Sequence, residues 1–212
     1  MKTLNLWHTP YREMWERQRA WQQEVRSGGE QLIVCTEHLP VYTLGKHGKE
    51  ANVLHLPEGV ECIRIDRGGD VTWHGPGQLT LYPIVDLKLL RLGVKEYVSL
   101  LEQAVIDTLE HYGIKGERVE GATGVWLETG TPRERKICAI GVKVSHGVTM
   151  HGLALNVSNS IAPFAAIHPC GFTDKGVTTI VLELPDTQAV PDVAEVAARI
   201  APRLETLLTQ KQ

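Results

Sequence analysis

Two kinds of apolar spacing divide the chain into predicted helices and strands. Apolar residues three or four positions apart, each run followed by a glycine, predict helices over residues 11–28 and 94–112. The same spacing predicts a last helix over residues 193–208, with Asp192 as its N-cap, and Pro202 is expected to kink or split it. Short apolar or alternating runs predict strands at residues 31–36, 41–44, 60–65, 79–85, 123–127, 136–144, 148–157 and 165–170.

The order of these elements predicts the fold class. An early helix, several strands, a central helix, more strands and a final helix favour one α/β or α+β domain over residues 1–212, with a mixed, largely antiparallel sheet flanked by helices. No internal repeat or linker divides the chain. Residues 37–40 are expected to form a turn ahead of Pro40. Pro83 is expected to end its strand or to place it at a sheet edge.

Composition and charge exclude several classes of protein. The chain has 212 residues, of which 42% are hydrophobic, so it can bury a sizeable core. Its formal net charge of -3 gives no overall attraction to nucleic acid. No apolar run is long enough to span a bilayer, and the first residues lack the apolar core of a signal peptide. We therefore expect a cytoplasmic protein without nucleic-acid or membrane partners.

The four cysteines are Cys35, Cys62, Cys138 and Cys170, and no two of them form a C-x-x-C pair. In a reducing compartment they are expected to be free thiols. The first three lie in strand-like patterns, where a free cysteine packs as a small hydrophobic residue. Cys170 lies in a Pro-Cys-Gly turn, which can expose a thiol and leave backbone N–H groups to stabilise an oxyanion. Cys170 is therefore the candidate nucleophile.

Residues 66–78, with the sequence DRGGDVTWHGPGQ, interrupt the apolar alternation between two predicted strands. Their glycines let other atoms approach the backbone closely. The polar and aromatic side chains among them favour a binding cradle, and a long glycine-rich hairpin is the alternative. The segment matches neither the P-loop pattern nor the Gly-x-Gly-x-x-Gly pattern of dinucleotide folds.

A nucleophilic thiol needs a base or a cationic neighbour. His168 would share a face with Cys170 if that segment is extended. Lys136 opens an apolar strand and is a second candidate, unless it is an ordinary surface lysine. His74, His151, His168 and Cys170 could converge on zinc, but no pair of them has the close spacing of a known zinc motif. No metal or other cofactor is predicted.

Four segments, in order, resemble the signatures of the lipoyl(octanoyl) transferases. They are residues 67–78, 135–141, 151–156 and 169–171. The resemblance implies the fold of the biotin and lipoate ligase catalytic domains. It also implies transfer of an octanoyl group from octanoyl-acyl carrier protein to a lysine of a lipoyl domain, in 2-oxoacid dehydrogenase subunits or the glycine cleavage H protein. The reaction would need neither ATP nor a cofactor, and the enzyme is expected to be a monomer.

The resemblance also implies residue roles. Cys170 corresponds to the nucleophile that forms the acyl thioester, and Lys136 to the partner that lowers its pKa; His168 lies outside the family motif. We expect Arg67 and residues 46–49 to meet the acidic carrier protein. The positions that correspond to substrate-binding walls are Arg67, Gly68, Gly69, Asp70, Val71, Thr72, Trp73, His74, Ala139, Ile140, Gly141, Gly152, Leu153 and Ala154.

Three other functions fit the same pattern. An ATP-dependent lipoate or biotin ligase would use the glycine-rich segment and Lys136 but would not need Cys170. A thiol-dependent amidotransferase would move lipoyl groups between proteins. A non-catalytic module would only bind acylated carrier proteins, and its Cys170 would be an ordinary thiol.

Overall fold

The structure is a computed structural model, and it describes residues 1–168 and 176–210. Its helices are α1 (Tyr11–Arg26), α2 (Val94–His111), α3 (Ile180–Glu183) and α4 (Val193–Thr209), with 3-10 turns at Glu50–Asn52 and Ala162–Ala166. Its strands are β1 (Lys2–Thr9), β2 (Leu32–His38), β3 (Val41–Leu44), β4 (Cys62–Arg64), β5 (Val71–His74), β6 (Gln78–Ile84), β7 (Gly124–Leu127), β8 (Arg135–Ser145), β9 (Val148–Asn156) and β10 (Gly176–Val177).

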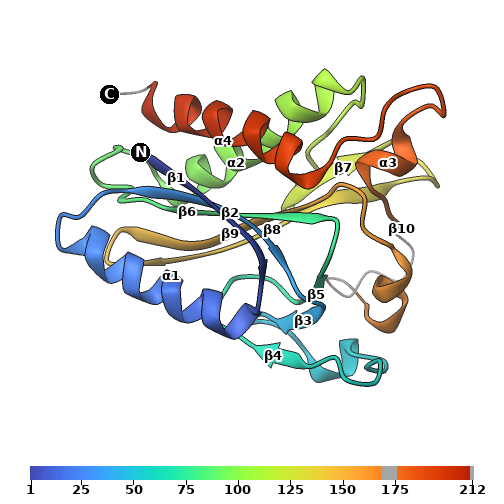
Figure 1. The fold of residues 1–212 in the computed structure, drawn as a ribbon, viewed down its shortest axis with the longest axis horizontal. Coiled ribbons are helices and arrows are strands. Elements are labelled where there is room, and N and C mark those ends of the chain that lie inside the picture. Colours follow the sequence, from blue (N-terminus) through green and yellow to red (C-terminus); the bar gives the residue numbers. More distant parts are fainter. Residues whose placement is uncertain (169–175, 211–212) are drawn as a thin grey trace.

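Two sheets organise these elements (Figure 1). Among the described residues, the large sheet has the strand order β1-β2-β6-β9-β8-β10, and β7 also pairs with β8. The pairs β2–β6, β6–β9, β8–β9 and β7–β8 are antiparallel, whereas β1–β2 and β8–β10 are parallel. The small sheet has the order β4-β3-β5. The predicted fold class, a mixed and largely antiparallel sheet flanked by helices, is confirmed.

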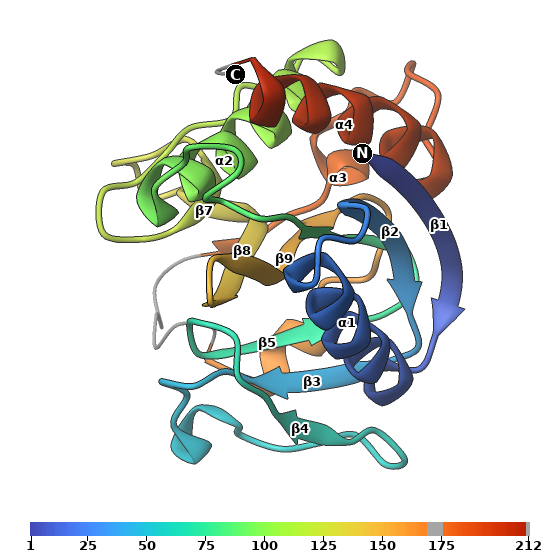
Figure 2. The same ribbon diagram turned by 90° about the vertical axis from the view of Figure 1, so that its left-hand side faces the viewer.

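Both faces of the large sheet are covered, as Figures 1 and 2 show. Helices α2 and α4 lie on one face, where Leu101 and Leu204 pack with Leu155 of β9 in the main core. Helix α1 and the small sheet lie on the other face, where Met14 and Tyr82 share a second core. No helix in the described part of the chain is long and apolar enough to cross a bilayer.

The three long helices were predicted from spacing and are confirmed. The Asp192 carboxylate accepts a hydrogen bond from the backbone N–H of Glu195 at 2.7 Å, so it caps α4 as predicted. The prediction that Pro202 splits this helix is wrong, because α4 continues through it. Pro202 removes the N–H that would bond the Ala198 carbonyl, and Ala198 and Pro202 are both exposed on the solvent side of the helix. Buried Ile200 and Leu204 anchor the helix on both sides of the proline.

Three predicted segments need correction, and one strand was not predicted. Residues 37–40 do not form a turn, because β2 continues to His38, which pairs with Thr9 of β1. Strand β1 itself was not predicted; it is an edge strand with a largely exposed alternation. The segment predicted as a loop at residues 66–78 contains β5, which pairs with β3. In place of the strand predicted at residues 165–170, a 3-10 turn ends at Ala166 and Ile167 forms a single antiparallel bridge with Val53; the last two positions lie outside the described residues.

Pro83 does not mark a sheet edge, since β6 lies between β2 and β9. The last paired residue of β6 on the β9 side is Leu81, opposite Leu153. Beyond it the Thr149 hydroxyl donates to the Pro83 carbonyl at 2.7 Å. The ladder with β9 has therefore ended before the proline, so its missing N–H leaves no partner unsatisfied on that side, while the ladder with β2 continues through Pro83 opposite Ile33.

The Asp192 cap is expected to matter for stability. Asp192→Ala should lower the free energy of unfolding by about 1 kcal/mol, because the first turn of α4 loses its side-chain acceptor. The measurement is urea unfolding of both proteins. The control is Asp186→Ala, at an exposed turn position, with an expected change below about 0.5 kcal/mol. Equal losses in the two variants would show that the cap contributes nothing specific.

Candidate active site

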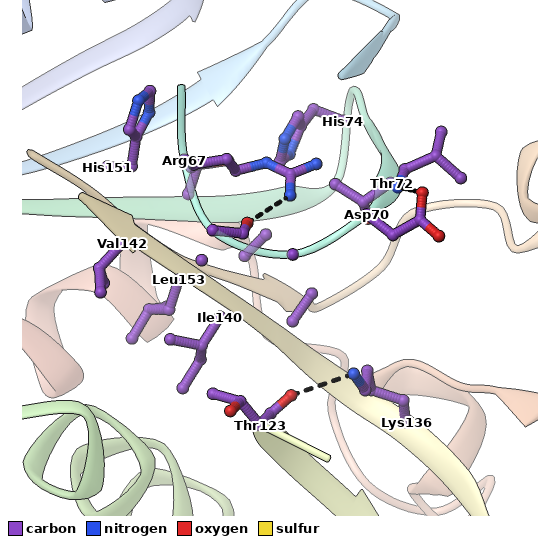
Figure 3. A pocket seen from close by; sticks show the side chains of 18 of the residues that line it. Arg67, Asp70, Thr72, His74, Thr123, Lys136, Ile140, Val142, His151 and Leu153 are labelled. Carbon is purple, nitrogen blue, oxygen red and sulfur yellow. Dashed lines mark hydrogen bonds between the residues drawn. The ribbon is translucent and has the colours of Figure 1, made fainter. Parts of the chain in front are cut away.

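A cavity of about 410 Å³ lies between the large sheet and the glycine-rich segment. Figure 3 shows β8 passing across it, with Arg67 and Asp70 on one side and Lys136 toward one end. Lys136 and all but one of the predicted wall residues line it: Arg67, Gly68, Gly69, Asp70, Val71, Thr72, His74, Ala139, Ile140, Gly141, Gly152, Leu153 and Ala154. Cys170 lies outside the described residues.

The sheet face toward the glycine-rich segment carries small residues. Ala139 pairs with Ala154, and Gly141 pairs with Gly152, across β8 and β9. Because side chains alternate along a strand, these two pairs share one face. The neighbouring pair Cys138 and Leu155 points to the opposite face, into the core under α2 and α4. The small floor leaves space for the cavity on this face, and the cavity also reaches Ile140 and Leu153, whose side chains alternate to the other face.

The glycine-rich segment approaches β8 through backbone contacts. The Gly68 N–H donates to the Val142 carbonyl at 3.0 Å. A Cβ on Gly141 would lie 2.7 Å from the Gly68 carbonyl oxygen, and a Cβ on Gly45 would lie 2.4 Å from that of Gly69. Such distances are closer than real Cβ atoms come, so both positions require glycine. The segment is therefore held against β3 on one side and β8 on the other.

Trp73 differs in placement from the other predicted wall residues. On β5 it alternates with Thr72 and His74, which face the cavity. Its ring packs edge-on against Phe164, with the ring centroids 5.8 Å apart. Trp73 is therefore part of a small buried core with Tyr42 and Ala166.

Lys136 reaches the cavity because β8 contains a bulge. The pairing with β7 shifts register, so that Trp126 faces Lys136 and Val125 faces Cys138, which leaves Ile137 without a partner. Ile137 and Cys138 are both fully buried in the core, and Lys136 lines the cavity together with Ala139. The Lys136 ammonium donates to the Thr123 carbonyl at 3.1 Å and lies 4.4 Å from the centre of the Trp126 ring.

A buried arginine lies beside neutral histidines in the part of the cavity away from Lys136. The Arg67 guanidinium donates to the Thr43 carbonyl at 2.8 Å and to its hydroxyl at 2.9 Å. Burial lowers the pKa of His74 far below its usual range, and the charge of Arg67 lowers it further. Burial lowers the pKa of His38 to about 4. The expectation that Arg67 meets a carrier protein is wrong, because its side chain is buried.

His151 joins the cavity through an unusual backbone conformation. It has a φ of 61° within β9, and its Nε2 bonds the Asp66 carboxylate at 2.8 Å. The Lys143 ammonium donates to the other Asp66 oxygen at 2.6 Å. Although burial opposes it, the hydrogen bonds from His151 and Lys143 hold the pKa of Asp66 well below its usual range. Sequence patterns gave no role to Asp66 or Lys143.

The remaining predicted chemistry can be placed only in part. Cys35, Cys62 and Cys138 are free thiols, as predicted for them. Burial raises the pKa of Cys35 to about 12 and also raises that of Cys138, so neither is a ready nucleophile. No group of three or more potential metal ligands comes together in the part of the chain that the structure describes. Because Cys170 lies outside the described residues, the predicted pairing of His168 with it stays a prediction.

Comparison with known protein families gives a match over nearly the whole chain. The family described as the lipoyl protein ligase A/B catalytic domain matches residues 10–203. The chain belongs to this family. An octanoyltransferase of Bacteroides thetaiotaomicron is 51% identical over 226 residues, covering 100% of this chain and 98% of that relative. An octanoyltransferase of Thermobifida fusca is 47% identical, covering 88% of this chain and 80% of the relative.

Solved structures of low sequence identity share the fold. Lipoate-protein ligase A bound with ATP is 17% identical with a TM-score of 0.71, covering 98% of this chain and 85% of that one. The biotin protein ligase of Aquifex aeolicus is 14% identical with a TM-score of 0.59, covering 99% and 70%. The predicted resemblance to lipoate and biotin ligase domains is confirmed at the level of the fold.

The contact between the glycine-rich segment and β8 predicts how two glycine substitutions change stability. Gly141→Ala should lower the free energy of unfolding by about 1–3 kcal/mol, because the added methyl meets backbone that must move. Gly68→Ala, on the other side of the same contact, places its Cβ at an ordinary 3.4 Å from the Val142 carbonyl. Denaturant unfolding should show a clearly smaller loss for Gly68→Ala, and the reverse order would contradict the geometry.

The neutral histidines predict how stability depends on pH. The folded-state pKa of His38, about 4, is depressed below the unfolded value of about 6.5. The stability that neutral His38 contributes is therefore fully present above pH 6.5. It is lost as the pH falls toward 4, and the free energy of unfolding drops by up to about 3 kcal/mol. In His38→Asn this part of the slope should disappear from unfolding curves measured between pH 7.5 and 4. His55→Asn, at an exposed position, should keep the wild-type slope, and an unchanged slope in His38→Asn would refute the assignment.

Proposed function

We propose that this protein transfers an octanoyl group from acyl carrier protein to a lysine of a lipoyl domain, through a thioester on Cys170. The observation that carries the proposal is the cavity between a glycine-rich segment and a floor of small residues, with the Lys136 amine on its wall. Relatives about half identical over their full length are octanoyltransferases. The family and this cavity therefore support the same chemistry.

The cavity suits an unbranched apolar chain. Ala139, Gly141, Gly152 and Ala154 leave room above the sheet, and Val71 supplies an apolar wall. Burying the six methylenes of an octanoyl group at about 0.8 kcal/mol each contributes about 5 kcal/mol to binding. The chain then fixes the position of the thioester carbonyl, which is where proximity accelerates acyl exchange.

In the first step, the Cys170 thiolate attacks the carbonyl carbon of the octanoyl thioester. A new C–S bond forms, the bond to the carrier sulfur breaks, and the carrier thiolate takes a proton from the Lys136 ammonium. At pH 7 a thiolate costs about 2 kcal/mol relative to the thiol. An ammonium about 4 Å away offsets this with about 4 kcal/mol at an effective dielectric constant near 20. One thioester replaces another, so the step needs no ATP.

In the second step, the amine of the lipoyl-domain lysine attacks the Cys170 thioester. The C–N bond forms, the C–S bond breaks and the Cys170 thiolate is restored. The neutral Lys136 amine accepts the proton that the attacking nitrogen loses, and the ammonium is ready for the next cycle. An amide is more stable than a thioester, so this step drives the reaction forward.

The partners and location follow from the same chemistry. An acyl donor and a lipoyl-domain acceptor are common to the family. We assign octanoyl-acyl carrier protein as donor, and lipoyl domains of 2-oxoacid dehydrogenase subunits and the glycine cleavage H protein as acceptors. The enzyme acts as a monomer, and residues 1–212 form one catalytic domain. The free thiols Cys35, Cys62 and Cys138 suit the reducing cytoplasm.

An ATP-dependent ligase is the second candidate, because lipoate-protein ligase A bound with ATP shares the fold with a TM-score of 0.71. The two functions differ in their need for ATP. The protein is mixed with octanoyl-acyl carrier protein and an unmodified lipoyl domain, and octanoylation of the domain is followed by mass spectrometry. We expect the same rate, within twofold, with ATP and Mg²⁺ or after their enzymatic removal. Dependence on ATP would establish the ligase instead.

The same assay tests Lys136. Lys136→Ala should slow transfer about 100-fold or more, because general acid–base catalysis typically contributes 10²–10⁴-fold. Lys95→Ala, at an exposed position of α2, should keep the wild-type rate. Full activity of Lys136→Ala at neutral pH would remove the proposed role of this residue.

A further inference from the structure

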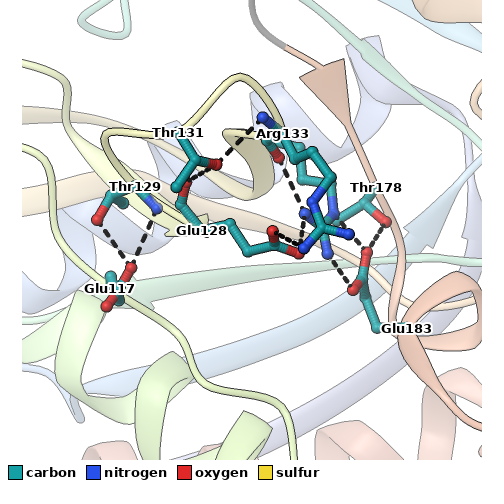
Figure 4. Close-up of polar contacts among 8 residues, drawn as sticks. Glu117, Glu128, Thr129, Thr131, Arg133, Thr178 and Glu183 are labelled. Atoms are coloured by element: carbon teal, nitrogen blue, oxygen red, sulfur yellow. Dashed lines mark hydrogen bonds and ion pairs between the residues drawn. The ribbon is translucent and has the colours of Figure 1, made fainter.

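Thr178 connects three hydrogen bonds beside Lys136. Its backbone N–H donates to the Lys136 carbonyl at 3.0 Å, and its carbonyl accepts from the Asn156 side-chain N–H at 3.0 Å. Its hydroxyl donates to Glu183, as Figure 4 shows. Glu183 in turn binds the guanidinium of Arg135, which precedes Lys136 on β8. Thr178 thus holds the backbone carbonyl of Lys136, and Glu183 holds the side chain of the residue before it.

The Asn156 side chain links Thr178 to the neighbouring strand β6. It lies directly opposite Gln78 in the β6–β9 ladder, and its side-chain oxygen accepts from the Gln78 amide at 2.9 Å. The Gln78 oxygen bonds Nδ1 of His74 at 2.8 Å, and Nε2 of His74 lies 3.3 Å from the Thr43 hydroxyl. That hydroxyl accepts from Arg67 at 2.9 Å. A continuous series of hydrogen bonds therefore joins the glycine-rich segment to Thr178.

The Thr178 end of this series fixes its direction. A backbone carbonyl can only accept, so the Asn156 and Gln78 amides each donate toward Thr178, and Nδ1 of His74 must carry the proton that the Gln78 oxygen accepts. Because the pKa of His74 is lowered, the ring is neutral, so its Nε2 accepts from the Thr43 hydroxyl. Every member is buried, so a broken link leaves a polar group without water to replace the partner.

We propose that Asn156 is a positioning residue for Lys136, acting through the Thr178 backbone. The Asn156 N–H holds the carbonyl of Thr178, and the N–H of Thr178 holds the carbonyl of Lys136. The series also ties this placement to the glycine-rich segment that covers the acyl cavity. The proposal rests on the catalytic role of Lys136 in the proposed function.

The test replaces one donor without changing the shape of the side chain. In Asn156→Asp the carboxylate still accepts from Gln78 but presents an acceptor to the Thr178 carbonyl. We expect kcat for octanoyl transfer to fall about 10–100-fold while KM for octanoyl-acyl carrier protein changes less than threefold. In the Lys136→Ala background the same substitution should lower the remaining rate less than twofold, because its effect passes through Lys136.

Asn159→Asp is the matched control. Asn159 is also buried, but it lies outside the series, and its side-chain N–H donates to the Ser160 carbonyl. Its variant should keep kcat within twofold in both backgrounds. An equal loss in Asn159→Asp, or an equal loss from Asn156→Asp with and without Lys136, would overturn the proposal in favour of a general effect on the fold. Melting temperatures of all variants are measured alongside.

A second readout separates this proposal from the proposed function. The rate at which N-hydroxysuccinimide acetate modifies Lys136, relative to exposed Lys95, is mapped by mass spectrometry without any acyl donor. Asn156→Asp should change this ratio at least threefold, and Asn159→Asp should not. An unchanged ratio would refute the positioning role even if the wild-type protein transfers octanoyl groups. A changed ratio in a protein that transfers none would support it while the proposed function fails.

Discussion

The candidate site depends on one close backbone contact, between the glycine-rich segment and β8. The Gly68 N–H reaches the Val142 carbonyl, and Gly141 lies beneath it where no Cβ fits. This contact holds residues 67–72 over the sheet at a height that leaves a cavity above the small floor. A larger residue at the contact would move the segment, and the cavity wall would move with it.

Charge is distributed unevenly around the cavity. The Arg67 guanidinium is buried beside the neutral imidazoles of His38 and His74, and it donates hydrogen bonds to the Thr43 hydroxyl and to the Gly68 carbonyl. The second cation, Lys136, lies over the Trp126 ring and donates a hydrogen bond to the Thr123 carbonyl. The two cations are therefore held apart: Arg67 is bonded to the protein backbone, and Lys136 lies on the cavity wall, where the proposed function assigns it proton transfer.

The sequence allowed most of the fold and much of the site to be predicted, for different physical reasons. Helices with a regular apolar stripe and strands of the central sheet were located because burial on a fixed face leaves a period. β1 was missed because an edge strand has little buried pattern, and the end of β2 was misplaced because His38 is satisfied by a side chain of a distant strand. Pro202 was misjudged because its cost depends on whether the orphaned carbonyl meets water.

Wall residues of the cavity were found through short motifs, which place Ala139, Gly141 and Gly152 in one ladder. Tyr11 and Thr80 also line the cavity, but their positions in α1 and β6 look like ordinary core positions in sequence. The bulge that turns Lys136 toward the cavity leaves no sequence signal, because it depends on pairing with β7. Register and side-chain direction therefore required the structure.

The proposed thioester mechanism can be checked by the intact mass of the protein after mixing with octanoyl-acyl carrier protein in the absence of ATP. It predicts a gain of one octanoyl group that hydroxylamine removes, that maps to the peptide containing Cys170 and that is absent in Cys170→Ala. Octanoylation of a lipoyl domain without any acylated protein, or with Cys170→Ala as active as the wild type, would contradict it.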